Sequence, residues 1–216
     1  MKHKKSKLSK IKLPKFNFPK INLKDILIRL PSLIFSSPIV TLVTTIILIP
    51  RIEYIGLIAS SLFFYVLFPI LTYLYLYKKG LITDKKFDFN IRKREERTLY
   101  NIIITMGFFT NYVLLSMYNI PVVQEVALFL LLSFFVFTLV TLFWKISGHM
   151  TQTVLLILIL AYVFKDYQIY ITLAGYLVCI PLVGLSRIKL KHHDIWQVLA
   201  GTFVTTAIGV LVFTIA

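Results

Sequence analysis

Apolar residues in this chain fall into seven blocks that are separated by short polar or charged segments. An α-helix needs about 20 apolar residues to cross the ~30 Å hydrocarbon core of a bilayer, and most of the blocks have about that length. The pattern therefore predicts an all-α protein, a polytopic membrane bundle of six to seven transmembrane helices. The blocks cover residues 31–50, 53–77, 99–118, 121–143, 150–164, 167–185 and 196–216.

Two blocks depart from a simple span. The first contains Pro38, which interrupts a helix unless it stands in the first turn, and the fifth is short unless it begins near Ile146. Two connections are tight enough to be turns between antiparallel helices, one at residues 119–121 and one at residues 165–166. We predict a basic juxtamembrane tail over residues 1–30 and one transmembrane domain over residues 31–216.

Composition supports a membrane protein. The chain is 58% hydrophobic and 15% charged, with a mean hydropathy of +0.82, which is too apolar for a soluble domain. Tyrosine and tryptophan favour the headgroup layer, and several stand at the ends of apolar blocks: Tyr73, Tyr75, Tyr77, Trp144 and Trp196. The single Cys179 excludes an internal disulfide. We expect no cleavable signal peptide, because the N-terminus is basic and lacks an apolar core.

The net charge of +15 is concentrated in the tail and the loops. Residues 1–30 hold nine lysines and Arg29, and Pro14 and Pro19 argue against one continuous helix there. Two interpretations have equal weight: a segment that lies on anionic lipid, with a short helix over 24–30, or a solvated tail that only fixes orientation. No nucleic-acid motif appears, so the predicted partners are an anionic bilayer and a phosphorylated lipid.

The distribution of Lys and Arg predicts the topology. If all seven blocks cross, the tail, the 78–98 loop, the 144–149 turn and the 186–195 loop share one side. These segments hold 10, 8, 1 and 3 of the 24 Lys and Arg residues, and the other side holds only Arg51 and Lys165. The positive-inside rule then places the N-terminus and these loops in the cytoplasm, at the cell membrane. If 31–50 lies on the surface instead, the tail and the loops fall on opposite sides.

Three short motifs at the edges of the blocks carry the candidate chemistry. They are Arg94-Glu95-Glu96-Arg97, Ser147-Gly148-His149, and Ser186-Arg187 followed after five residues by His193. Two blocks separate each motif from the next, so all three emerge on one face. The guanidinium fork of arginine matches phosphate oxygens, and backbone N–H groups at a helix start favour an anion. The motifs therefore predict one composite phosphate site.

The second and third motifs resemble those of the type 2 phosphatidic acid phosphatase (PAP2) superfamily, over about residues 85–210. That family has a six-helix core, which the resemblance implies here. Its first motif is Lys-x6-Arg-Pro, for which Arg97-Thr98 is the nearest match, with Asn90 at the lysine position. Lys85 and Arg92 also have the required spacing.

The resemblance implies the roles of the site residues. His193 would attack phosphorus to form a phosphohistidine, and His149 would protonate the leaving oxygen and then activate water. No metal or other cofactor is implied. The candidate substrates are phosphatidic acid, phosphatidylglycerol phosphate and polyprenyl diphosphate. The phosphate-binding residues would be Arg97, Arg94, Lys93, Ser147, Gly148, Ser186 and Arg187.

One position departs from the family pattern, because Gln197 stands where the third motif has an aspartate. Gln197 is four residues after His193, so it can hydrogen-bond the imidazole but cannot stabilise imidazolium by charge. Asp194 is a possible substitute, and Ile146 replaces the proline usual before Ser-Gly-His. The alternative function is a weakened or inactive PAP2-like protein that binds phosphorylated lipids.

Plainer interpretations also remain. His149 could cap a helix, and residues 92–97 could be an ordinary basic loop. Phosphotransfer from a lipid to another acceptor uses the same intermediate. A small transporter is the weaker alternative, because we expect no charged side chain within the apolar blocks.

Overall fold

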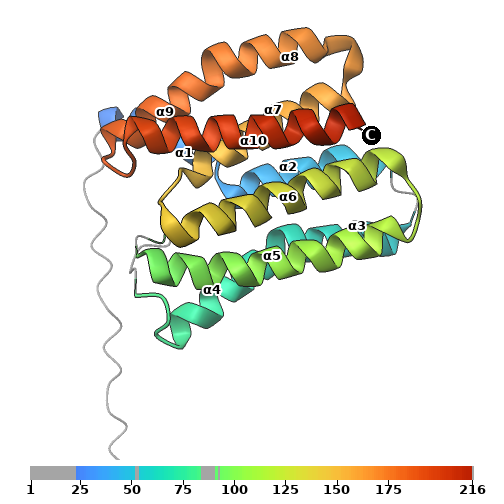
Figure 1. The fold of residues 1–216 in the computed structure, drawn as a ribbon, viewed down its shortest axis with the longest axis horizontal. Helices are drawn as coiled ribbons and strands as arrows, with labels where there is room; N and C mark the ends of the chain where they lie inside the picture. Colours follow the sequence, from blue (N-terminus) through green and yellow to red (C-terminus); the bar gives the residue numbers. More distant parts are fainter. Residues whose placement is uncertain (1–22, 52–53, 84–90, 92, 216) are drawn as a thin grey trace, which may run out of the picture.

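The computed structural model describes residues 23–51, 54–83, 91 and 93–215. Most of the predicted tail lies outside the described residues, as do Lys85, Asn90 and Arg92. The described chain is helical, and no strand occurs within it. All seven predicted blocks form helices (Figure 1).

Five helical segments of the described chain are long and apolar enough to cross a membrane. The first combines α3 (Ile55–Leu62), a π-helical turn (Phe63–Leu67) and α4 (Phe68–Lys78). Next come α5 (Arg94–Ser116) and α6 (Pro121–Phe143). The fourth, Lys165–Lys189, contains α8 (Gln168–Ala174) and α9 (Ile180–Lys189), and the fifth is α10 (Ile195–Ile215). This arrangement is compatible with an integral membrane protein.

The first block is a broken helix and not a straight span. The helices α1 (Leu23–Ile34) and α2 (Ser37–Leu48) meet at an angle of 46°. Pro38 stands in the first turn of α2, where a missing N–H costs little. Residues 24–30 are helical as predicted, but α1 continues through Pro31 to Ile34, so the predicted boundary at residue 30 falls inside a helix. The first block is broken as predicted, with the break at residues 35–36, just before Pro38. Counting this bent pair as one span would give six.

The helix α7 (Gly148–Val163) is short, as the sequence predicted. Its 16 residues extend about 24 Å at 1.5 Å per residue. The interior core gathers around α5 and α6, where the Phe108 ring lies 4.9 Å from Tyr65 and 4.4 Å from Phe134. Large apolar side chains such as Phe143 and Ile55 instead cover the outside, at 82% and 80% exposure. A hydrophobic outer surface of this kind suits contact with lipid.

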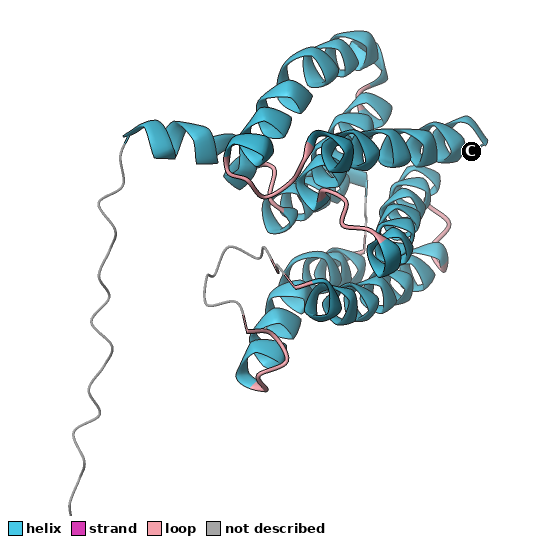
Figure 2. Cartoon of the chain, turned by 60° about the vertical axis from the view of Figure 1, so that its left-hand side comes forward, coloured by secondary structure: helices cyan, strands magenta, loops and turns pink. Residues whose placement is uncertain are grey.

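The ends of the helices bring the three motifs together. The start of α5, the α6–α7 connection and the α9–α10 loop lie at one end of the bundle (Figure 1). In the turned view of Figure 2, α1 projects from this same end, and it packs against α9. The described part of the N-terminal segment therefore lies at the same end of the bundle as the motifs. This agrees with the prediction, from the number of blocks between them, that they share one side.

Candidate active site

A cavity of about 100 Å³ lies at this end of the bundle. Its walls come from the starts of α2, α5 and α7, from α6, and from the α9–α10 loop. Four of the predicted site residues line it: Arg97, Gly148, His149 and His193. Segments nearly 100 positions apart in sequence thus contribute to one site.

A helix-ending turn fixes the position of His193. After α9 ends at Lys189, Lys191 adopts a left-handed backbone with φ 54°. The N–H of Lys191 donates to the carbonyl of Ile188 at 2.9 Å, and the N–H of His192 donates to that of Arg187 at 3.1 Å. This pair of bonds is a Schellman motif. The spacing of five residues between Arg187 and His193 is therefore the number of residues that this turn needs to bring His193 back to the end of α9.

The start of α10 fixes the chain on the C-terminal side of His193. Asp194 caps this helix, because its Oδ1 accepts from the backbone N–H of Gln197 at 2.9 Å. His193 is 7% exposed and lines the cavity, whereas the His192 carbonyl accepts from the Lys145 ammonium at 3.1 Å. The prediction that His193 is the inward-facing histidine is confirmed. Asp194 has a capping role, so it does not replace the missing aspartate.

Gln197 sets the tautomer of His193. The imidazole Nδ1–H donates to Gln197 Oε1 at 2.8 Å, which leaves Nε2 with the lone pair of a neutral ring. Burial lowers the pKa of His193 to about 3, the Gln197 hydrogen bond opposes this shift, and Lys145, Arg187 and Arg97 lower the pKa further. His193 is therefore a neutral base at physiological pH, surrounded by three cations.

The start of α7 is anchored on α10. The backbone N–H of Ser147 donates to the Gln197 carbonyl at 3.1 Å. A Cβ on Gly201 would lie 2.7 Å from the Ser147 carbonyl oxygen, so only glycine permits this approach. His149, the second residue of α7, is close enough to Arg187 and His193 to interact with both electrostatically. The helix start and these residues together make the cavity wall electropositive.

Arg97 is the arginine that lines the cavity. Its side chain is 8% exposed, and its Nε and Nη2 atoms have no hydrogen-bond partner within the described part of the chain. These donors are available to an anion in the cavity, in the planar geometry that suits phosphate. Arg187 is also buried and acts on both histidines, although it does not line the cavity.

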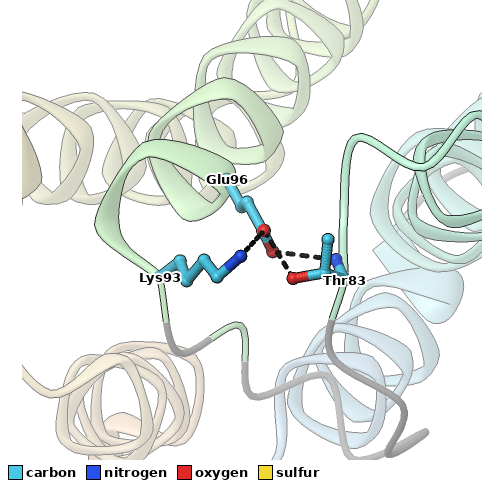
Figure 3. A network of polar contacts seen from close by, with 3 residues as sticks. All are labelled: Thr83, Lys93 and Glu96. Atoms are coloured by element: carbon cyan, nitrogen blue, oxygen red, sulfur yellow. Dashed lines mark hydrogen bonds and ion pairs between the residues drawn. The ribbon is translucent and has the colours of Figure 1, made fainter.

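Two predicted phosphate-binding residues have other contacts. Lys93 pairs with Glu96 at 3.2 Å, and Glu96 also accepts from the N–H and the hydroxyl of Thr83 (Figure 3). Arg94 is exposed and donates to the Phe143 carbonyl at the end of α6. Neither residue lines the cavity. Lys93 contacts a carboxylate, and Arg94 contacts a carbonyl at a helix end. Both partners attract cations, as phosphate does.

The serines also differ from the prediction. Ser186 donates to the Ile28 carbonyl at 2.6 Å and shares a 2.7 Å hydrogen bond with Ser32. It thus joins α9 to α1 and does not line the cavity. The Ser147 hydroxyl is fully buried and has no partner among the described residues, but it does not line the cavity either.

The sequence reasoning missed several polar residues of the cavity wall. Asn101, Thr151 and Gln152 line it, as do Ser36 and Ser37 at the α1–α2 break. For Asn101 and Gln152 the available signal was a polar side chain inside an apolar block, one helical turn from Arg97 or His149.

The reasoning also overlooked an acidic residue. Glu125 lies within the 121–143 block, contrary to the expectation of no charge there, and accepts a hydrogen bond from the Tyr162 hydroxyl. This pair belongs to the start of α6, at the opposite end of the bundle from the cavity (Figure 1).

Fold and site together define an all-helical bundle with a buried, cationic, imidazole-containing cavity at one end. Among the residues that the structure describes, no group of three or more His, Cys, Asp or Glu side chains is placed to hold a metal ion. Comparison of the chain with protein-family models, with curated proteins and with solved structures finds no match.

Proposed function

We propose that the chain is an integral membrane lipid phosphatase of the PAP2 type. It hydrolyses a phosphate monoester or diphosphate of a lipid, and its site faces the cytoplasm. The observation that carries the proposal is the convergence of His193, His149 and Arg97 on one cavity. The bias of Lys and Arg toward this end supports the orientation. Labelling of a cysteine placed at Lys85 from each side of the membrane tests it.

The reaction has two displacements. Nε2 of neutral His193 attacks phosphorus, the P–O bond to the lipid breaks, and protonated His149 gives its proton to the leaving oxygen. His149, now neutral, takes a proton from water as the water oxygen attacks phosphorus. The P–N bond then breaks, which releases inorganic phosphate and neutral His193.

Cations and hydrogen bonds support both steps. Arg97 holds the phosphoryl oxygens, where charge develops during transfer, and the positive charge of buried Arg187 acts on them from behind the cavity wall. Gln197 keeps the proton on Nδ1, so Nε2 remains the attacking atom. Burial, Arg187 and the neighbouring imidazoles lower the pKa of His149 well below its usual value, so His149 is neutral in the free site. The negative charge of the bound phosphate raises this pKa and favours the protonated form that the first step requires.

Phosphate release from phosphatidic acid, phosphatidylglycerol phosphate and polyprenyl diphosphate in detergent micelles tests the proposal. We expect His193→Ala to abolish release and His192→Ala to retain most of it, because His192 does not line the cavity and its backbone carbonyl, which bonds Lys145, is kept in the variant. Radiolabelled substrate should leave a phosphoryl group on the wild type that His193→Ala lacks. Equal release by wild type and His193→Ala would overturn the proposal.

A non-catalytic lipid-binding protein is the second candidate, and Gln197 is the observation that favours it. A neutral amide cannot stabilise the positive ring that forms when His193 is phosphorylated. This candidate predicts that phosphorylated lipids bind, that Arg187→Ala weakens binding, and that no lipid is turned over. Measured turnover by the wild type excludes it.

A further inference from the structure

A second set of polar groups lies deeper in the same cavity. Asn101, Thr151 and Gln152 are 4%, 3% and 4% exposed, and all three line the cavity. Asn101 Nδ2, Thr151 Oγ1 and Gln152 Oε1 have no hydrogen-bond partner within the described chain. Buried polar atoms without partners are costly, so this clustering around one cavity indicates a ligand with matching polar atoms.

The helices place these groups on the inner side of the phosphate-binding residues. Both α5 and α7 begin at the site end and run into the bundle (Figure 1). Asn101 is four residues beyond Arg97, and Gln152 is three beyond His149. At 1.5 Å per residue, Asn101 and Gln152 are about 4–6 Å further from that end, and Thr151, two residues beyond His149, is about 3 Å further. A phosphate held by Arg97 and His193 would therefore place its ester-linked atoms beside them.

The hydrogen-bonding capacity of the set is mixed. Asn101 Nδ2 donates, Gln152 Oε1 accepts, and the Thr151 hydroxyl does both. A glycerol unit matches this set, because its ester and hydroxyl oxygens accept and a free hydroxyl also donates. A prenyl chain offers only hydrocarbon at this depth and would leave all three groups unmatched. Phe134 and Phe137 provide the apolar wall that a lipid chain needs.

We infer that Asn101, Thr151 and Gln152 form a subsite for the glycerol oxygens of a glycerol-based lipid phosphate monoester. The inference rests on the proposed function and specifies its substrate class. The subsite gives the protein a preference for such lipids over prenyl phosphates, because each lost hydrogen bond weakens binding by about five- to tenfold.

The test compares 1-acylglycerol 3-phosphate with a prenyl monophosphate of matched chain length. We expect wild type to have a kcat/KM about tenfold or more higher for the glycerol lipid. Asn101→Leu should reduce that preference about five- to tenfold, because it removes one of the three hydrogen bonds, and the loss in kcat/KM should be larger for the glycerol lipid than for the prenyl phosphate. Asn111→Leu is the matched control, since Asn111 is equally buried on α5 but does not line the cavity. A wild type without preference, or a parallel loss for both substrates in Asn101→Leu, overturns the subsite.

Binding measurements separate this inference from the proposed function. Non-hydrolysable phosphonate analogues of both lipids should show the same preference in their dissociation constants. If nothing is hydrolysed but the analogue preference appears and is lost in Asn101→Leu, the phosphatase proposal fails and the subsite stands. If both analogues bind equally well, the subsite fails whatever the activity. Melting temperatures of both variants identify any that fail to fold.

Discussion

Changing Gln197 alters the hydrogen bond that orients the imidazole of His193, the proposed nucleophile. Gln197→Leu removes the oxygen that accepts the hydrogen bond from His193 Nδ1 at 2.8 Å. Gln197→Glu keeps a side chain of the same length with an acceptor oxygen and adds a negative charge. Losing a hydrogen bond in a buried site costs about 1–3 kcal/mol, and His193 is only 7% exposed. We therefore expect Gln197→Leu to lower kcat by about 10- to 100-fold.

The glutamate variant has the opposite effect on the transition state. Attack by Nε2 leaves the phosphorylated ring with positive charge while Nδ1 keeps its proton. A charge-assisted hydrogen bond is roughly twice as strong as a neutral one, which corresponds to about a tenfold gain in kcat at neutral pH. The carboxylate also raises the pKa of His193 above its value of about 3, because a nearby negative charge favours the protonated ring.

The pH dependence distinguishes this mechanism from a simple packing effect. In wild type, His193 keeps its free base at pH 5, so loss of activity from its protonation begins only near its pKa of about 3. In Gln197→Glu this acid limb moves to higher pH. The assay is kcat/KM for lipid phosphate hydrolysis between pH 4 and pH 8. A Gln197→Glu variant without an acid limb in this range, or a Gln197→Leu variant with wild-type kcat, would refute the assigned role of Gln197.

Four further outcomes follow from the geometry. Arg97→Lys should lower kcat/KM by about 10- to 100-fold through lost guanidinium hydrogen bonds, whereas exposed Arg94→Lys should leave it within about twofold. Gly201→Ala places a Cβ 2.7 Å from a backbone oxygen of α7, so it should reduce both melting temperature and kcat. Lys191→Gly relieves the φ of 54° and should stabilise the protein by about 1 kcal/mol in thermal unfolding. The pKa of His193 falls from 6.5 to about 3 on folding, so the unfolded chain binds more protons than the folded chain between these pH values. The melting temperature should therefore fall as the pH drops from 6.5 toward 3. This fall should be smaller in His193→Gln.

The helical blocks were predictable because apolar length alone determines them. The shared face of the three motifs followed from parity, and His193 followed from its spacing after Arg187. Lys93, Arg94 and Ser186 were not predictable, because their partners depend on tertiary packing: Glu96, the end of α6 and the α1 backbone. The sequence does not show which side chains will bond to a helix-end carbonyl or to a neighbouring helix. A residue that could bind phosphate can therefore have another partner in the folded protein.

The charge around the cavity determines which ligands the site can accept. No acidic residue lines it within the described chain, while Arg97 lines it and Lys145 and Arg187 act on His193. The first turns of α2 and α7 add two helix N-termini to the wall, and each favours negative charge. A monocation or a neutral lipid gains nothing from this field, whereas a phosphate dianion offsets it. Burial is the main cause of the low pKa of His193, and the same cations lower that pKa further, so the charges that attract phosphate also help to keep Nε2 unprotonated.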